Sequence, residues 1–166
     1  MKALVLLVLV FGAGVSCFCK EVKGHSMSFQ VDNNVSLENN AEGFGDSLIF
    51  KFNEPGKFFM LTPGRGTSKS MIKKITEGAI ASTKGDVKRQ KGLEIKTVSN
   101  HDVSLGIFSG TEVEFVIVES KSKRELRQYL YILWDGRLCW TGRFACGAAS
   151  ETTPVHNILK SAKKTK

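Results

Sequence analysis

The sequence predicts an α+β fold, in which helices flank an antiparallel β-sheet in an α/β/α sandwich. Three observations predict it: alternating apolar runs joined by short turns, two segments with helical spacing, and a hairpin whose first arm is apolar on both faces. The 166 residues, 42% hydrophobic and 24% charged, are enough for one domain with a proper core.

The first residues have the pattern of an export signal. Lys2 precedes the apolar run ALVLLVLVF, and small residues follow as far as Cys17. The run is too short for a membrane span, which needs about 20 residues. We assign residues 1–19 to a signal peptide and expect residues 20–166 to form a single exported domain.

The end of this signal fits two kinds of processing. Gly14 and Ser16 are small residues that suit a signal peptidase cutting after Ser16. Ser16-Cys17 also resembles the end of a bacterial lipobox, in which the cysteine becomes lipidated, although Gly14 stands where that motif usually has an aliphatic residue. We therefore expect a periplasmic or secreted protein, or a lipoprotein anchored through Cys17.

Three strands are expected next. Apolar residues alternate from Met27 to Val31, and the pattern recurs in SLIFKF and, after a turn at Asn53–Gly56, in KFFML. The polar stretch Asp32–Asp46 is typical of a surface loop. The sequence TPGRG, Thr62–Gly66, should end the third strand.

A helix should begin near Thr67 or Ser68, either of which can cap it, and end at Lys84–Asp86. Its predicted buried face consists of Met71, Ile72, Ile75 and Ala79. Three strands should follow, with turns at Ser99–Asp102 and Ser109–Gly110.

The segment Gln128–Cys146 holds both tryptophans and both tyrosines. Asp135-Gly136 predicts a tight hairpin turn with positive φ at both residues. The arm before it is apolar on both faces, which indicates an interior strand. A closing helix should begin at Thr153, its buried face formed by Val155, Ile158, Leu159 and Ala162.

This order of elements resembles the PsbP-like family of α/β/α sandwiches. The features that carry the resemblance are the F-x-x-P turn Phe52–Pro55, the strand–turn–strand unit Leu105–Val118, the aromatic hairpin Tyr129–Trp140 and the last helix ending in ILKSAKK. They span about Phe50–Ser161, but Phe58 and Phe59 stand where the family often has Trp. The resemblance implies a non-enzymatic interaction module.

The segment Pro63–Ser70 looks like an anion site, since a glycine-containing turn precedes a helix. Its glycine spacing does not match the Walker pattern, so a plain loop and helix cap is the preferred interpretation. If an anion binds, the residues that would hold it are Arg65, Thr67, Ser68 and Lys69.

The cysteines leave two alternatives. Cys139 and Cys146 could form a disulfide if the chain turns at Gly142, or they could be two buried thiols. The chain has no Cys-x-x-Cys and its three histidines are scattered, so we expect no metal site and no cofactor.

The hairpin also carries a mixture of aromatic and basic residues. Trp134, Arg137, Trp140 and Arg143 could form a surface for a protein partner. The alternative is that the tryptophans seal the sheet against a helix.

No catalytic motif is evident. Glu112 and Glu114 share a strand face that alternation assigns to solvent, and His101-Asp102 is expected in a turn. We therefore expect an exported, non-enzymatic binding or interaction protein that takes a protein partner and no nucleic acid. The alternative is a secreted enzyme, a hydrolase whose site has no motif.

The charge leaves a further alternative. The net charge is +8. Lys69, Lys73 and Lys74, with the C-terminal lysines, could attach the protein to an anionic polymer or to lipid headgroups.

Overall fold

The computed structural model describes residues 19–39, 46–147 and 151–165. Its strands are β1 (Cys19–Gly24), β2 (Met27–Asp32), β3 (Ser36–Asn39), β4 (Leu48–Lys51), β5 (Phe58–Gly66), β6 (Leu93–Leu105), β7 (Phe108–Glu119), β8 (Glu125–Trp134), β9 (Leu138–Gly147) and β10 (Lys163–Lys164). Its helices are α1 (Ile72–Arg89), which follows the 3-10 turn η1 (Lys69–Met71), and α2 (Thr153–Lys160).

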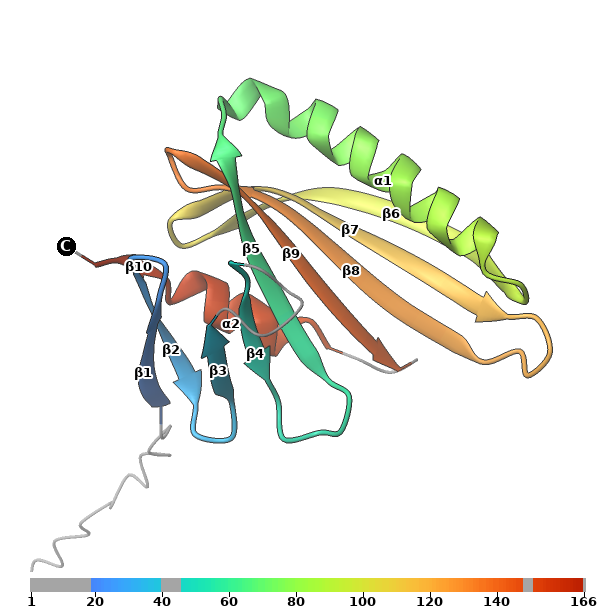
Figure 1. Ribbon diagram of the computed structural model, residues 1–166, viewed down its shortest axis with the longest axis horizontal. Coiled ribbons are helices and arrows are strands. Elements are labelled where there is room, and N and C mark those ends of the chain that lie inside the picture. The colour runs from blue at the N-terminus through green and yellow to red at the C-terminus, as the bar shows by residue number, and fades with distance from the viewer. Residues whose placement is uncertain (1–18, 40–45, 148–150, 166) are drawn as a thin grey trace, which may run out of the picture.

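The central layer is a seven-stranded antiparallel sheet with the order β3-β4-β5-β9-β8-β7-β6. Helix α1 runs along β6 and packs on one face, where it contacts β6, β7 and β8 (Figure 1). The opposite face is covered by a second, three-stranded sheet, β1-β2-β10, together with the short helix α2. Neither helix has the length and hydropathy that crossing a bilayer requires, within the described residues.

The predicted α/β/α sandwich is wrong, because the protein is mostly β and strands cover much of the second face. The polar segment Cys19–Gly24 was not predicted as a strand, yet it pairs with β2 as β1. Lys163 and Lys164, expected at the end of a helix, pair with the other edge of β2 as β10. The antiparallel pairing expected from the short turns is present throughout the described sheets.

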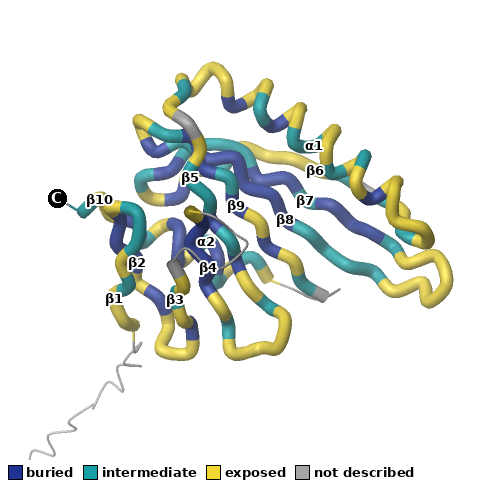
Figure 2. Tube along the Cα trace, viewed as in Figure 1, coloured by how far each residue is buried: buried dark blue, intermediate teal, exposed yellow. Residues whose placement is uncertain are grey.

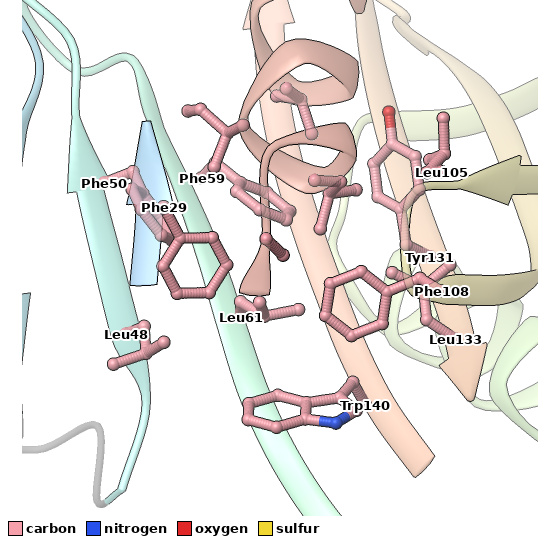
Figure 3. Packing of buried hydrophobic residues seen from close by; sticks show 14 of the residues in the cluster. Phe29, Leu48, Phe50, Phe59, Leu61, Leu105, Phe108, Tyr131, Leu133 and Trp140 are labelled. Atoms are coloured by element: carbon pink, nitrogen blue, oxygen red, sulfur yellow. The ribbon is translucent and has the colours of Figure 1, made fainter. Parts of the chain in front are cut away.

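The larger core lies between the central sheet and this second layer. Aromatic side chains cross it in series: Phe29 of β2 contacts Phe50 of β4 at 5.2 Å between ring centroids, and Phe50 stacks on Phe59 of β5 at 5.8 Å. Phe59 meets Tyr131 of β8 edge-on at 5.8 Å. Figure 3 shows these rings in one continuous cluster, which joins the two sheets through buried apolar area.

The smaller core lies under α1. The helix buries Ile72 and Val87 against Val113 and Phe115 of β7 and against neighbouring apolar residues of β8. Of its 18 residues only Ile72, Thr76 and Val87 are buried. Figure 2 shows the rest of the helix as exposed or intermediate. The contact between helix and sheet is therefore light.

Several predicted boundaries in the first half are wrong. Strand β5 continues through TPGRG to Gly66, with an irregular register between Pro63 and Gly66. The predicted loop Asp32–Asp46 contains β3. Helix α1 begins only at Ile72, runs past Gly85 to Arg89, and leaves Met71 41% exposed.

The two turns predicted around β6 are also wrong. Residues Ser99–Asp102 lie inside β6, because β7 pairs with them along the whole strand. The actual turn is at Gly106-Ile107, where Gly106 has φ +65°. Gly110 lies within β7, where a Cβ atom would come 2.0 Å from the carbonyl oxygen of Ile132. That glycine permits close strand contact and does not mark a turn.

The hairpin β8–β9 and the face of α2 are confirmed. Tyr129, Tyr131 and Leu133 are buried on one face of β8. In the hairpin turn only Gly136 has positive φ, +95°, and Asp135 does not. The predicted residues of α2 and the segment after it, Val155, Ile158, Leu159 and Ala162, are all buried.

Candidate functional site

A groove separates the first half of α1 from strands β6 and β7. Its volume is about 710 Å³. The helix contributes Ile72, Thr76 and Ile80 to its lining, with lysines at the rim. The polar residues that the strands contribute are Asn100, His101, Asp102, Ser104, Ser109 and Thr111. Such a mixture of aliphatic and polar groups suits binding of a ligand with both characters.

The one polar side chain that α1 buries beside the groove, Thr76, has its hydrogen bond satisfied within the helix. Thr76 is buried, and its hydroxyl donates to the carbonyl oxygen of Ile72 at 2.9 Å. That bond removes an unsatisfied hydroxyl from the interior, so Thr76 offers mainly its methyl group. The hydrogen-bonding groups open to a ligand therefore come mostly from β6, where Asn100, Asp102 and Ser104 are exposed.

A second groove, of about 540 Å³, continues along the other half of α1. It lies between Lys84, Val87 and Lys88 of the helix and the first residues of β6, from Leu93 to Val98. Together the two hollows follow the helix along β6. The alternation of Leu93 and Ile95 in the sequence predicts a strand with one apolar face here. Nothing in the sequence indicates that α1 leaves space above that strand.

Strand β6 is an edge strand. It is the last strand in the order of the central sheet, so the backbone groups on its outer side have no strand partner among the described residues. Near its start the register shifts between Ile95 and Thr97, and Lys96 forms a 2.7 Å ion pair with Glu125 of β8. From Val98 to Leu105 the strand pairs regularly with β7.

A cluster of titratable side chains lies on the opposite face of the sheet. Glu112 is only 3% exposed, and its Oε2 accepts from His156 Nε2 of α2 at 2.5 Å. His101 Nε2 lies 3.5 Å from its other oxygen. The prediction that Glu112 faces solvent is wrong, because α2 folds over this part of β7. His101-Asp102 lies in mid-strand, so its predicted turn is also wrong.

Tyr131 lies beside this cluster, and its ring meets that of His156 edge-on at 6.0 Å. Burial, followed by the neighbouring Glu112 charge, raises the pKa of Tyr131 well above its usual range. Its hydroxyl has no hydrogen-bond partner of normal geometry in the described part of the chain. These contacts tie α2 to the sheet, and the groove under α1 is on the other side.

Glu114, the second acidic residue on the strand face that was expected to be exposed to solvent, has different partners. Its Oε1 accepts from Arg127 Nη1 at 2.5 Å and from the Tyr129 hydroxyl at 3.2 Å. The two carboxylates are therefore engaged separately, one with histidines and one with an arginine. This is not the shared environment that a catalytic pair requires.

The predicted partner surface is not assembled. Trp140 is 1% exposed, and its indole N–H donates to Asp135 Oδ2 at 2.9 Å. Trp134 lies on the opposite face, where its N–H donates to the carbonyl oxygen of Thr67 at 3.3 Å. Both arginines are exposed, Arg137 in the turn before β9 and Arg143 within β9, six residues further along the chain. Trp140 packs in the core between the two sheets beside Phe108, and Trp134 packs against the core under α1.

The residues of the predicted anion site lie at the junction of β5 and η1. Ser68 is the N-cap of η1, but its side chain makes no capping bond and instead lies 2.7 Å from the Ser70 hydroxyl. Thr67 offers its carbonyl to Trp134, and Lys69 lines the groove under α1. The backbone of Arg65 belongs to β5. Anion binding here stays a prediction.

Of the two alternatives for Cys139 and Cys146, the geometry of β9 rules out the disulfide. Both residues lie in β9, seven positions apart, so their side chains point to opposite faces of the sheet. At about 3.3 Å per residue their Cα atoms are roughly 23 Å apart, far beyond the reach of a disulfide of about 7 Å. Cys139 is buried under α1 and Cys146 Sγ contacts the carbonyl of Arg127. Cys17, the predicted lipidation site, lies outside the described residues.

No group of three or more histidine, cysteine or acidic side chains is placed to hold a metal ion, as far as residues 19–39, 46–147 and 151–165 are concerned. The Glu112 cluster makes a polar contact between α2 and the central sheet through His156. The groove under α1 and the edge of β6 form the candidate functional site.

No family model and no curated protein matches this chain. Among solved structures, it is similar to a crystal structure from Bacteroides thetaiotaomicron VPI-5482, with a TM-score of 0.53 and 13% identity. The similarity covers 85% of this chain and 46% of that protein, so this chain spans less than half of its length. At this identity the likeness shows the fold alone, and no match supports the PsbP-like resemblance.

Proposed function

We propose that this protein is a non-enzymatic binding protein, exported through its N-terminal signal, and that its partner occupies the groove between α1 and β6. The observation that carries the proposal is the groove of about 710 Å³ beside an exposed strand edge. Surface hollows of this size, lined by aliphatic and polar groups together, are typical of binding sites.

The chemistry of the lining supports binding more than catalysis. Hydroxyl, amide and aliphatic groups make up most of the lining, beside the charged or titratable Lys69, Lys73, Glu77, His101 and Asp102. The buried Glu112–His156 pair faces the other layer. A pair engaged with α2 on that side is not within reach of a molecule bound in the groove. The lining can therefore hold and orient a partner without an evident nucleophile and base in contact.

Site-specific photocrosslinking in the native host tests this proposal. A photoreactive phenylalanine analogue replaces Asn100 or Ser104, which line the groove, or Ser82, which is exposed on α1 and does not line it. We expect adducts at Asn100 and Ser104 and none at Ser82. Equal labelling at all three sites, or no adduct in the groove, would contradict the proposal.

The intact mass of the protein purified from its host tests the export signal. A chain beginning at a diacylglyceryl Cys17 would indicate an anchored lipoprotein, and an unmodified chain cut after Ser16 a secreted or periplasmic one. A mass that retains Met1 and the following apolar run would contradict export.

A further inference from the structure

We infer that the partner is an extended polypeptide segment that adds to the outer edge of β6 as a further antiparallel or parallel strand, with an acidic part beside the end of α1. The inference rests on the proposed function, since it names the kind of molecule that the groove holds.

The first argument is the open edge. Strand β6 has 13 residues, and its outer backbone groups have no strand partner within the described residues. Long unprotected edges invite pairing with another chain, and proteins usually blunt them with bulges and lysines. Here the bulge and Lys96 are confined to the first residues of the strand.

The second argument is the register between edge and groove. The regular part of β6, from Val98 to Leu105, runs beside the larger groove, which Asn100, Asp102 and Ser104 line. These alternate residues share the face that α1 covers. A strand added to β6 would place every second side chain on this same face, under α1 and into the groove.

The third argument is the polarity of the groove walls. The lining of the smaller groove carries Lys84 and Lys88 against one acid, Glu94, while its third lysine, Lys96, is already paired with Glu125. Around the larger groove, Lys69 and Lys73 are balanced by Glu77 and Asp102. An acidic part of the partner is therefore favoured near the C-terminal end of α1, and apolar or hydroxyl side chains along the rest.

The fourth argument is the apolar surface that the grooves offer to the side chains of an added strand. Ile72 and Ile80 of α1 line the larger groove, and Val87, Leu93 and Ile95 line the smaller one. Ile80, Leu93 and Ile95 are only half-buried. Covering their remaining apolar surface would contribute about 25 cal/mol for each Å² removed from water.

Displayed decapeptides test the inference. The library alternates apolar and random residues and carries either an acidic or a basic pair at one end. We expect selection of acidic-ended sequences, with affinity falling at least about tenfold for Ser104→Lys and changing less than about twofold for Ser82→Lys. The double variant Lys84→Glu, Lys88→Glu should reverse the preference and select basic-ended sequences.

Backbone methylation distinguishes strand addition from side-chain binding. In the selected peptide, N-methyl groups are placed on every second residue, in one of two alternate sets. One set should abolish binding, because those N–H groups donate to β6, and the other should leave it nearly unchanged. Amide exchange within Val98–Leu105 should slow on binding. Equal tolerance of both methylated sets, or no protection of β6, would overturn the inference.

The crosslinking experiment separates this inference from the proposed function. Adducts that contain no polypeptide would leave the groove as a binding site and eliminate strand addition. An adduct with a second copy of this chain, together with a dimer in sedimentation, would also overturn the assignment of a separate partner. Absence of any groove adduct would remove the proposed function itself.

Discussion

Asp135 organises the end of the hairpin. Its Oδ1 accepts from the backbone N–H groups of Arg137 and Leu138 at 2.8 and 2.9 Å, and its Oδ2 accepts from the Trp140 indole at 2.9 Å. Burial alone would raise the pKa of Asp135, but these bonds and the nearby Lys164 outweigh it, so its pKa is lowered. An aspartate at the start of a turn, two residues before a free N–H, is the sequence signal for such a bond.

We expect Asp135→Asn to destabilise the protein by about 1–3 kcal/mol at pH 7, because the amide cannot accept from all three donors and loses the charge. The lowered folded pKa means that this stabilisation is present above the unfolded pKa of about 3.9 and is lost as pH falls through the folded pKa. Urea unfolding at pH 7 and pH 3 measures it. The difference between wild type and variant should be smaller at pH 3, and an equal difference at both would contradict this role.

Gly110→Ala tests the close approach of β7 and β8. The added methyl group would come 2.0 Å from the Ile132 carbonyl oxygen, which belongs to the backbone and cannot move independently. We expect a loss of roughly 4 kcal/mol or failure to fold. Gly78→Ala is the control, since nothing lies within 4 Å of its Cβ position, and it should stabilise α1 by about 0.5–1 kcal/mol. Thermal unfolding of both variants measures the difference, and a Gly110→Ala protein as stable as wild type would refute it.

At the scale of elements, α2 is attached to the sheet by one polar contact and an apolar face. His156 of α2 meets Glu112 of β7, and Val155, Ile158 and Leu159 fill the core below it. A buried carboxylate needs such a partner, because an unpaired charge in the interior is costly. Helix α1 has fewer buried residues for its length, which leaves the grooves beside β6.

A double-mutant cycle measures the attachment of α2. We expect Glu112→Gln and His156→Gln to be coupled by about 1–2 kcal/mol in urea unfolding at pH 7, because they are in direct contact. The matched cycle of Glu112→Gln with His101→Gln should give a coupling near zero, since His101 is 57% exposed and 3.5 Å away. Equal coupling energies in both cycles would contradict a specific contribution of the Glu112–His156 contact to stability.

At the scale of the whole molecule, the C-terminal segment joins the layers. The Ser161 hydroxyl accepts from the Gln30 N–H at 2.8 Å, Ala162 is buried, and the Thr165 N–H donates to the Ser26 carbonyl at 2.8 Å. Lys164 Nζ donates to the Asp135 carbonyl oxygen at 3.0 Å. The chain end thus connects β2 to the hairpin turn of the central sheet.

Truncation tests this connection. A chain ending at Ser161 should lose roughly 2 kcal/mol or more of stability, because the β10 pairing and the burial of Ala162 disappear. A chain ending at Thr165 is the control and should unfold like the full protein. Denaturant unfolding of the two gives the comparison, and equal midpoints would contradict a role for β10.

Local patterns were enough to predict β2, β4, the hairpin and the buried face of α2. In these segments the apolar residues recur every second position in strands, or with the helical period in α2, and those same residues are the buried ones. The pattern matches burial because each segment packs one face against a single neighbouring layer. The turn residues Asn53–Gly56 and Gly136 were also predicted, since their conformational preferences are local.

The rest depended on contacts between distant segments. Glu112 has the alternation of a solvent-facing residue, and only α2, 44 residues later, buries it. The polar β1 and the lysines of β10 become strands because β2 offers both edges to them. Residues Ser99–Asp102 were expected to form a turn but belong to β6, because β7 pairs with this strand along its length. Period and turn chemistry therefore determined which residues turn inward, while the layer that covers each face, and with it the groove beside β6, was decided by tertiary packing.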